Sequence, residues 1–531
     1  MISDGEGWLI AGGLVFNGYG DPPVRADVLV RDGRVTAVGQ GLAAAATRPL
    51  DAAGAWVMPG FVDAHTHADL SALSGEAMEV RARAGVTTEI VGQDGLGYAP
   101  VSDASAELMA GVLAPITGVP FDAPGWPTIA AYLDACDAGA YARVAALVPH
   151  GAVRATVTGM TDRPATQAEH ADIAELVAVG MRDGALGLSS GLSYPPARWA
   201  TTDELVAAAR PAGTAGGRYV THLREYGRGL RAAIDEALQI GRQAPVGVHF
   251  SHFHISGPGR DGQANAYLAP LGSARATGQR VSLDSYPYPV SCTFLGAVLP
   301  AWLQAQPTDA LLASLRRPQT ATRTAVELDA NGPGTTFAVG WDGLILAGLA
   351  GSADADLDGR SVAEAASLRG CSAGSLVVAL AEAHDLMACV LAHQGHLSNV
   401  QRVAREPGHV VGSDGILGSG VPHPRAAGAF LRYLRWTRDG VVPIEPAGMI
   451  AAMTGVTAEL FGLEVGRLEP GGPADLLVVD PSRLEDGPDL GGWQPDAVRW
   501  SLIAGQLVVA DGTWLGRTLA GLALRRQEAG R

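Results

Sequence analysis

Two histidines, one residue apart, are the first side chains in the sequence that could do chemistry. His65 and His67 lie in the stretch PGFVDAHTHADL, after a short apolar run that predicts a β-strand. Alternate residues of a strand point to the same face, so both imidazoles point the same way, together with Asp63. Neutral imidazoles held close together are typical zinc ligands. The pair therefore predicts one part of a metal site.

Further side chains of ligand type stand at the ends of later predicted strands. His222 ends RYVTHL, His252 and His254 lie in VGVHFSHFH, and Asp414 ends HVVGSDG. Core packing does not explain this repeated placement, because a buried imidazole or carboxylate without a partner is costly. We therefore expect these strand ends to meet at a metal site. Taken singly, His249 is better interpreted as a satisfied core or surface residue, and His254 as a neighbour of the ligands.

The segment that carries these residues alternates short apolar strands with Ala-rich amphipathic helices. The candidate strands are GFVDAHTH, VTTEIVG, RVAALVPH, ALGLSSG, RYVTHL, VGVHFSHFH, RVSLDSYPY, MACVLA and HVVGSDG. This alternation predicts an α/β fold with a parallel β/α barrel over residues 57–463. Such barrels place their chemistry at the C-terminal ends of the strands. A stretch near residues 288–345, rich in Pro, Gly and Thr, is expected to form a lid insertion.

The two ends of the chain have a different pattern from the middle. Residues 1–56 and 464–531 contain β-branched runs broken by Gly, Asn and Asp, such as WLIAGGLVFNG, GPADLLVVD and WSLIAGQLVVADG. We expect both ends to build one small β-sandwich domain. The first residues lack a basic region and a long apolar run, so no signal peptide is expected.

Composition narrows the possible functions. The 531 residues carry a formal net charge of −16, and no basic stripe is visible, which argues against nucleic-acid binding. All 38 basic residues are Arg, so a Schiff base, a P-loop lysine and a carboxylated lysine that bridges two metals are excluded. Four cysteines without a CxxC pair fit a reducing compartment, and no apolar run is long enough to span a membrane. A cytoplasmic protein without membrane partners is expected.

On these motifs the chain resembles the amidohydrolase superfamily, and more closely its D-aminoacylase branch, the N-acyl-D-amino-acid deacylases. The matching stretches spread over about residues 56–480 and include PGFVDAHTHAD, GVTTEIVGQDG, ALGLSSGLSYPP, TTDELVAAA, THLREYG, SHFH, LDSYPY, VGSDG, PHPRAAGAF, MTGVTAELFGL and GRLEPGGPADLLVVD. The resemblance implies a TIM-like (β/α)8 barrel of a metal-dependent hydrolase. It also implies zinc as the metal.

The family pattern assigns the metal ligands residue by residue. They are His65, His67, His222, His252 and Asp414. Asp414 is also implied to take a proton from the attacking water. The chain departs from the family where Asn-Cys-Gly is usual, because it has Gln93-Asp94-Gly95. Asp94 could bind one metal ion or bridge two, and its harder oxygen would admit Mn²⁺ or Co²⁺ more readily than a thiolate would. The alternative is that Asp94 only caps a turn.

Substrate contacts are implied by the same comparison. Arg425, in PHPRAAGAF, matches a family arginine that binds the substrate carboxylate, a task that suits a bidentate guanidinium. Tyr194 and Tyr286 match family tyrosines near that group, or else they pack beside prolines. Cys292 stands at a small polar pocket position and is not expected to act as a nucleophile. His150 ends another predicted strand and is a further candidate for substrate contact.

The function implied is hydrolysis of the amide bond of N-acyl-D-amino acids, and the D-stereochemistry comes from the resemblance alone. Arg425 indicates a small-molecule substrate with a free carboxylate. It does not separate an N-acyl amino acid from a dipeptide, an N-carbamoyl compound or a cyclic amide. A non-catalytic binding protein is the remaining alternative, and the complete set of candidate ligands argues against it. Neither the number of metal ions nor the oligomeric state follows from the sequence.

Overall fold

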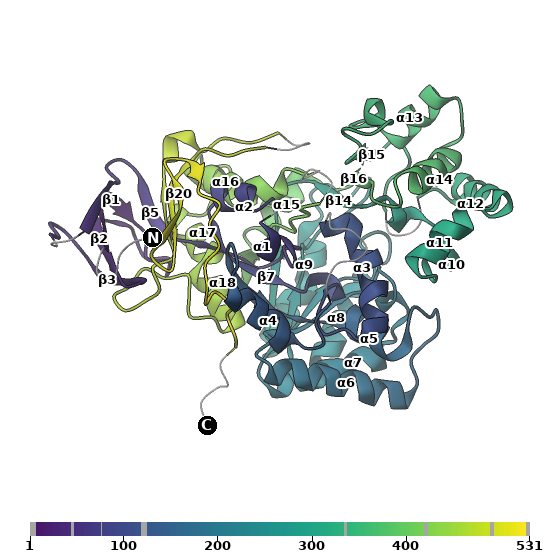
Figure 1. Ribbon diagram of the computed structural model, residues 1–531, viewed down its shortest axis with the longest axis horizontal. Helices are drawn as coiled ribbons and strands as arrows, with labels where there is room; N and C mark the ends of the chain where they lie inside the picture. The colour runs from purple at the N-terminus through teal and green to yellow at the C-terminus, as the bar shows by residue number, and fades with distance from the viewer. Residues whose placement is uncertain are drawn as a thin grey trace.

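The computed structural model describes residues 7–43, 47–75, 77–117, 125–333, 337–418, 423–488 and 493–526. Residues 1–6, for which no signal peptide is expected, and short parts of the predicted end segments and lid lie outside these ranges. Figure 1 shows three parts: a sheet that contains strands from both ends of the chain, a central barrel, and an insertion drawn in green at the upper right. None of the described helices has the length and apolar character needed to cross a bilayer.

The centre of the molecule is the predicted parallel barrel. Its strands are β6 (Phe61–Asp63), β7 (Val86–Val91), β8 (Arg143–Ala146) continued by β9 (Val148–Pro149), β10 (Gly187–Gly191), β11 (Arg218–His222), β12 (Gly247–Phe250), β13 (Val281–Ser285) and β17 (His409–Val411). Hydrogen bonds join them in the orders β6-β7-β8 and β9-β10-β11-β12-β13-β17. The ring closes where Ala64 N donates to Val411 O at 3.2 Å. Every one of these pairings is parallel.

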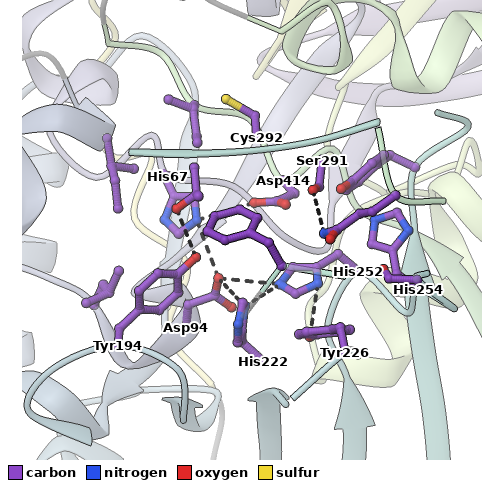
Figure 2. Close-up of a pocket in the computed structure, with 18 residues that line it drawn as sticks. His67, Asp94, Tyr194, His222, Tyr226, His252, His254, Ser291, Cys292 and Asp414 are labelled. Atoms are coloured by element: carbon purple, nitrogen blue, oxygen red, sulfur yellow. Dashed lines mark hydrogen bonds and ion pairs between the residues drawn. The ribbon is translucent and has the colours of Figure 1, made fainter. Parts of the chain in front are cut away.

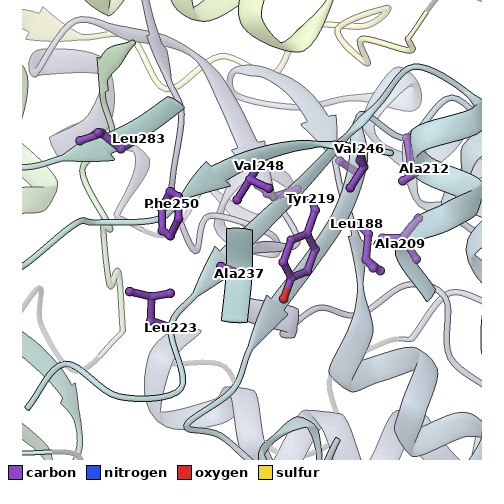
Figure 3. Close-up of a cluster of buried hydrophobic side chains, with 14 of the residues drawn as sticks. Leu188, Ala209, Ala212, Tyr219, Leu223, Ala237, Val246, Val248, Phe250 and Leu283 are labelled. Carbon is purple, nitrogen blue, oxygen red and sulfur yellow. The ribbon is translucent and has the colours of Figure 1, made fainter. Parts of the chain in front are cut away.

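Helices with small apolar residues cover the outside of the barrel. They are α1 (Ser71–Ser74), α2 (Met78–Arg83), α3 (Asp103–Thr117), α4 (Ile129–Ala138), α5 (His150–Thr158), α6 (Gln167–Arg182), α7 (Thr202–Thr214), α8 (Leu230–Gln243), α9 (Ala264–Ala276), α15 (Leu397–Val403), α16 (Arg425–Arg438), α17 (Pro446–Met453) and α18 (Gly455–Phe461). Buried alanines such as Ala209 and Ala237 face strand residues such as Val248 and Leu188 in one core (Figure 3). Because alanine is small, these helices can pack close to the strands.

Strands from both ends of the chain join in one sheet, where the sequence predicts a β-sandwich built from both ends. The strands are β1 (Gly7–Val15), β2 (Val24–Arg31), β3 (Arg34–Gly39), β4 (Thr47–Asp51), β5 (Trp56–Pro59), β18 (Leu476–Val479), β19 (Val498–Ile503), β20 (Gln506–Ala510) and β21 (Thr513–Trp514). Strand β18 pairs with β5 and so joins the two ends of the chain. The boundary with the barrel falls after Pro59, a few residues later than predicted. The predicted end domain also loses its last described residues, because Leu519 and Ala523 pair with the barrel residues Ala140 and Val144.

The insertion is longer and more regular than the predicted lid. It contains an antiparallel sheet of β14 (Val290–Phe294), β16 (Cys389–His393) and β15 (Leu344–Ala347), with α10 (Ala301–Gln304), α11 (Thr308–Leu315), α12 (Pro318–Asn331), α13 (Val362–Arg369) and α14 (Ala373–Ala383). A separate hydrophobic cluster fills it. The stretch MACVLA is therefore β16 of this sheet, and its prediction as a barrel strand was wrong. Its apolar run does not distinguish a buried antiparallel strand from a parallel one.

A buried ion pair joins the end sheet to the barrel. Arg143, at the start of β8, places Nε 2.6 Å and Nη2 3.1 Å from the two carboxylate oxygens of Asp475, next to β18. Asp475 also accepts a hydrogen bond from Ala504 N at 2.7 Å. Both side chains are buried. The pair therefore connects a barrel strand to the segment that leads into the end sheet.

We expect Asp475→Asn to destabilise the protein by about 3–5 kcal/mol, because it leaves the Arg143 charge buried without a counterion. Thermal and urea unfolding would measure the change. Asp235→Asn is the matched control, since Asp235 forms an exposed pair with Arg231 and its loss should change stability little. Equal effects of the two substitutions would show that the buried pair does not hold the domains together.

Candidate metal centre

The barrel brings all the predicted ligands to one end of its strands. His65, His67, Asp94 and Asp414 form one group of possible metal ligands, and Asp94, His222 and His252 form a second. Within each group the ligand atoms lie within 4.8 Å of one another. Figure 2 shows most of these side chains converging from separate strand ends on one cavity. The placement at strand ends thus predicted the histidines and Asp414 of this cluster, whereas Asp94 became a candidate through the resemblance to the family.

Asp94 lies between the two groups. Its Oδ1 is 3.4 Å from His65 Nε2, and its Oδ2 is 3.3 Å from His222 Nδ1 and 3.4 Å from His252 Nε2. His222 Nδ1 and His252 Nε2 are themselves 2.9 Å apart. Asp94 thus directs one oxygen to each group, an arrangement in which a carboxylate can serve two ions.

Asp414 belongs to the first group. Its Oδ1 lies 3.4 Å from His67 Nε2 and 3.7 Å from His65 Nε2. The other oxygen, Oδ2, lies 2.9 Å from Arg425 Nη1. One face of the carboxylate is thus directed to the candidate ligands and the other to a buried guanidinium.

The backbone turns sharply where these side chains enter the cavity. Asp94, His252 and Asp414 have φ values of 56°, 30° and 51°. Side-chain-bearing residues seldom adopt this left-handed region, and they tend to do so at functional sites. Gly92, which precedes the Asp94 turn, also has a positive φ of 71°, and a Cβ there would lie 2.7 Å from Leu147 O. A glycine is therefore required to bring Asp94 back over the barrel.

An ionic cluster below the centre holds the first and last strands together. Asp63 Oδ1 accepts hydrogen bonds from His65 N at 3.0 Å and Ser413 N at 2.9 Å. Arg81 is buried against Asp63 and also donates to both oxygens of Glu89, at 2.9 and 2.8 Å. The two negative charges and the one positive charge are thus brought together inside the protein. Asp63 fixes the spacing between the His65 and Asp414 segments.

Asp284 was not singled out in the sequence, although it stands on a barrel strand. Its Oδ1 accepts from His252 N at 2.8 Å, and its Oδ2 lies 2.9 Å from His249 Nε2 and 3.7 Å from His65 Nδ1. His249 also contacts Ser282 Oγ at 2.9 Å, which agrees with its interpretation as a satisfied core residue. Asp284 therefore positions ligands from two strands. Its place in LDSYPY, near the end of β13, was the available signal.

Two further contacts were missed because they come from loops. Ser193 Oγ lies 2.7 Å from His222 Nε2, and Tyr226 OH lies 3.2 Å from His252 Nδ1. Each contacts the ring nitrogen that does not face Asp94. Such partners orient metal-bound imidazoles and fix their tautomers. Nothing in the local sequence marks either residue.

The electrostatics of the cluster favour a cation. Burial alone would lower the pKa of His65, but Asp94, Asp284 and Asp414 raise it to about 9. Burial alone would raise the pKa of Asp94, yet His65, His222 and His252 bring it well below its usual value. His65 Nε2 and Asp94 Oδ1 are also buried without a hydrogen-bond partner. Imidazoles and carboxylates in this arrangement fit a divalent metal such as zinc.

A cavity opens above the cluster. Its walls consist of His67, Asp94, Leu96, Ile116, Tyr194, His222, Tyr226, His252, His254, Ser256, Tyr286, Ser291, Cys292, Thr293, Phe337, Gln394, Asp414 and Ile416. The predicted substrate residues Tyr194, Tyr286 and Cys292 are all among them. Neighbouring Cys389 and burial raise the pKa of the Cys292 thiol well above its usual value, so it is protonated and a poor nucleophile.

Two other predicted residues lie elsewhere. Arg425, the first residue of α16, is buried behind Asp414, and its Nη1 is 3.0 Å from Tyr286 OH. His150 is fully buried, its Nε2 is 3.0 Å from Glu204 Oε1, and it is not part of the cavity wall. The structure does not support the expectation that His150 contacts substrate, because its strand ends at a helix that packs the ring inward.

The chain belongs to the amidohydrolase family, whose sequence profile matches residues 49–509. It is 34% identical to a D-aminoacylase of Alcaligenes xylosoxydans xylosoxydans over 90% of this chain and 89% of that protein. It is 33% identical to an N-acyl-D-aspartate deacylase of the same organism, over 90% and 86% of the two chains. The crystal structure of N-acyl-D-glutamate deacylase from Bordetella bronchiseptica, complexed with zinc and a phosphonate inhibitor, aligns with a TM-score of 0.77, 29% identity and 96% and 98% coverage.

These comparisons confirm the resemblance to the D-aminoacylase branch and the barrel fold with an extra domain. The profile begins inside the end sheet and runs through the barrel and the insertion. The sequence similarity to the family therefore extends over every segment that contributes to the cavity.

We propose that Asp94 binds metal. Substitutions that remove its carboxylate or replace it by a different ligand atom test this proposal. Asp94→Ala should lower metal affinity, whereas Asp94→Cys should retain metal and shift the preference from manganese and cobalt toward zinc, because thiolate is softer than carboxylate. Titration of the apo proteins with Zn²⁺, Mn²⁺ and Co²⁺ would measure both effects. Identical affinities for wild type and both variants would leave Asp94 as a turn residue only.

Proposed function

We propose that this protein is a metal-dependent hydrolase of N-acyl-D-amino acids, and that it releases a carboxylic acid and a D-amino acid. The observation that carries the proposal is the cluster of His65, His67, Asp94 and Asp414 beside a buried arginine that contacts the same cavity wall. The relatives named D-aminoacylase and N-acyl-D-aspartate deacylase support the choice of substrate class. They are also the basis for the D-configuration.

The candidate ligands would hold one or two divalent ions, with zinc favoured by the imidazoles and Mn²⁺ or Co²⁺ admitted by Asp94. When bound, the metal supplies a Lewis acid that polarises the amide carbonyl and makes water more acidic. His65, His67 and Asp94 would hold the first ion, and Asp94, His222 and His252 the second.

Asp414 is the proposed proton acceptor. Burial alone would raise the pKa of its carboxyl, but Arg425 and the histidines lower it below its usual value, so the carboxylate is ionised. Asp414 also lines the cavity, where an attacking water would stand. It takes the proton from the water and passes it to the nitrogen of the leaving amine, a transfer that general acid–base catalysis requires.

The substrate's α-carboxylate is proposed to bind at the side of the cavity formed by Tyr286. The Arg425 guanidinium stands directly behind this wall and contacts Tyr286 OH, Asp414 Oδ2 and Cys292 O. Its Nε has no hydrogen-bond partner. Arg425 therefore offers a positive charge and a free donor next to the reacting groups.

Turnover of matched N-acyl-D- and N-acyl-L-amino acids by metal-loaded protein tests the proposed function. Hydrolysis of the D-compounds and loss of activity after chelation are the expected results. Dipeptides, N-carbamoyl amino acids and cyclic amides belong in the same panel. Preference for one of these would assign the site to another carboxylate-bearing amide.

We expect Asp414→Asn to lower kcat by at least about 100-fold, because an amide has a similar volume but cannot accept the proton. Steady-state kinetics would measure the loss. Circular dichroism and metal analysis of the same preparation would separate lost chemistry from lost structure. Activity within a few-fold of wild type would exclude Asp414 as the base.

We expect Arg425→Lys to raise KM for N-acetyl-D-leucine by about 10–100-fold, since lysine keeps the charge but loses the planar set of donors. The matched substrate is N-(3-methylbutyl)acetamide, which lacks only the carboxylate. Wild type should use it poorly, and the substitution should change its turnover little. An equal loss on both compounds would show that Arg425 has a structural role.

A further inference from the structure

The relatives differ in the amino acid that their names specify. Two name aspartate or glutamate, and one names no side chain, while their identities to this chain are 33%, 29% and 34%. Overall sequence identity therefore does not indicate which of these amino acids this protein accepts. An acidic substrate brings a second carboxylate into a cavity that already contains Asp94 and Asp414, so the cations near the cavity provide a physical criterion.

One wall of the cavity is apolar. Leu96, Ile116 and Ile416 line it and belong to a hydrophobic cluster that continues into α3 and the insertion sheet. Phe337 lines the same cavity from the insertion. These side chains are only 2–7% exposed, so a group that packs against them leaves water. Burial of an alkyl or aromatic group there is favourable.

The polar residues in the remaining lining are neutral or already engaged. Gln394 Nε2 donates to Ser291 Oγ at 2.9 Å, and neither side chain carries charge. His254 is buried in the wall and packs edge-on against Tyr286, with 4.7 Å between the ring centroids. The other lining histidines belong to the metal cluster.

No arginine forms part of the described cavity lining. Arg425, behind the wall, is balanced by Asp414 and is assigned to the α-carboxylate in the proposed function. Among the described residues, the cavity lining therefore offers no arginine to pair with a second substrate carboxylate.

We propose that the enzyme selects N-acyl-D-amino acids with uncharged, mainly apolar side chains and discriminates against aspartate and glutamate. This inference rests on the proposed function. A carboxylate buried against this wall loses its hydration, and no charged side chain of the wall compensates the loss. An apolar side chain has no such penalty and gains contact with the Leu96 and Ile116 wall.

The test compares kcat/KM of the zinc-loaded enzyme for the N-acetyl derivatives of D-leucine, D-glutamine, D-glutamate, D-asparagine and D-aspartate. Glutamine and glutamate have nearly the same size, so their ratio isolates the effect of charge. We expect glutamine to exceed glutamate by at least about 100-fold, and leucine to be the best of the five. If kcat/KM for N-acetyl-D-glutamate equals or exceeds that for N-acetyl-D-glutamine, the inferred selectivity is wrong, but the proposed function still stands. Hydrolysis of none of the five would overturn the proposed function with it.

A charge placed in the apolar wall gives a second test. Ile116→Arg should raise the glutamate-to-glutamine ratio of kcat/KM by at least about 10-fold, because it supplies the missing cation. Ile116→Gln is the matched control for size and polarity, and its ratio should stay at the wild-type value. Inhibition by free D-glutamate and D-leucine gives a readout independent of turnover. A folded Ile116→Arg protein with an unchanged ratio would contradict the placement of the side chain against this wall.

Discussion

Three buried carboxylates at one end of the barrel are the constraint on which the rest of the site depends. Asp94, Asp284 and Asp414 are each less than a tenth exposed, and burial of charge is costly unless opposite charges compensate it. Histidines from the ends of three strands, β6, β11 and β12, surround them. Burial alone would lower the pKa of His65, but the negative charge of the three carboxylates raises it to about 9. Arg425 balances one face of Asp414. A divalent cation held by the two ligand groups that share Asp94 would compensate the remaining negative charge.

The same constraint accounts for the backbone below the centre. Ligands that come from several strands must converge, and the chain adopts the left-handed region at Asp94, His252 and Asp414. Such conformations cost energy and persist only where the surroundings hold them. Asp63 and Arg81 supply part of that support by tying β6 to the Ser413 segment. The ionic cluster below the site and the strained turns within it are thus two parts of one arrangement.

The sequence predicts the barrel and its ligands for a physical reason. Parallel strands are mostly apolar along their length, so the ligand-type residues that follow RYVT and HVV stand out at the strand ends and mark the site. Asp284 follows the same rule, but its role depends on a contact with His249 that no local pattern reveals. The Arg425–Asp414 pair joins segments that meet only in the fold. The insertion was misjudged because Pro and Gly between its short helices conceal their periodicity, and because β16 has the same apolar pattern as a barrel strand.

Part of the apolar wall comes from segments that carry no candidate ligand. The candidate ligands and Asp414 stand on barrel strand ends, where a shift of one residue would disrupt the centre. Leu96 and Ile416 follow Asp94 and Asp414 on these same segments, but Ile116 belongs to α3 and Phe337 to the insertion. These elements pack in clusters separate from the main barrel core, so their side chains can change with little effect on the ligands. The inferred preference for uncharged side chains therefore depends partly on residues that can change without moving the metal ligands.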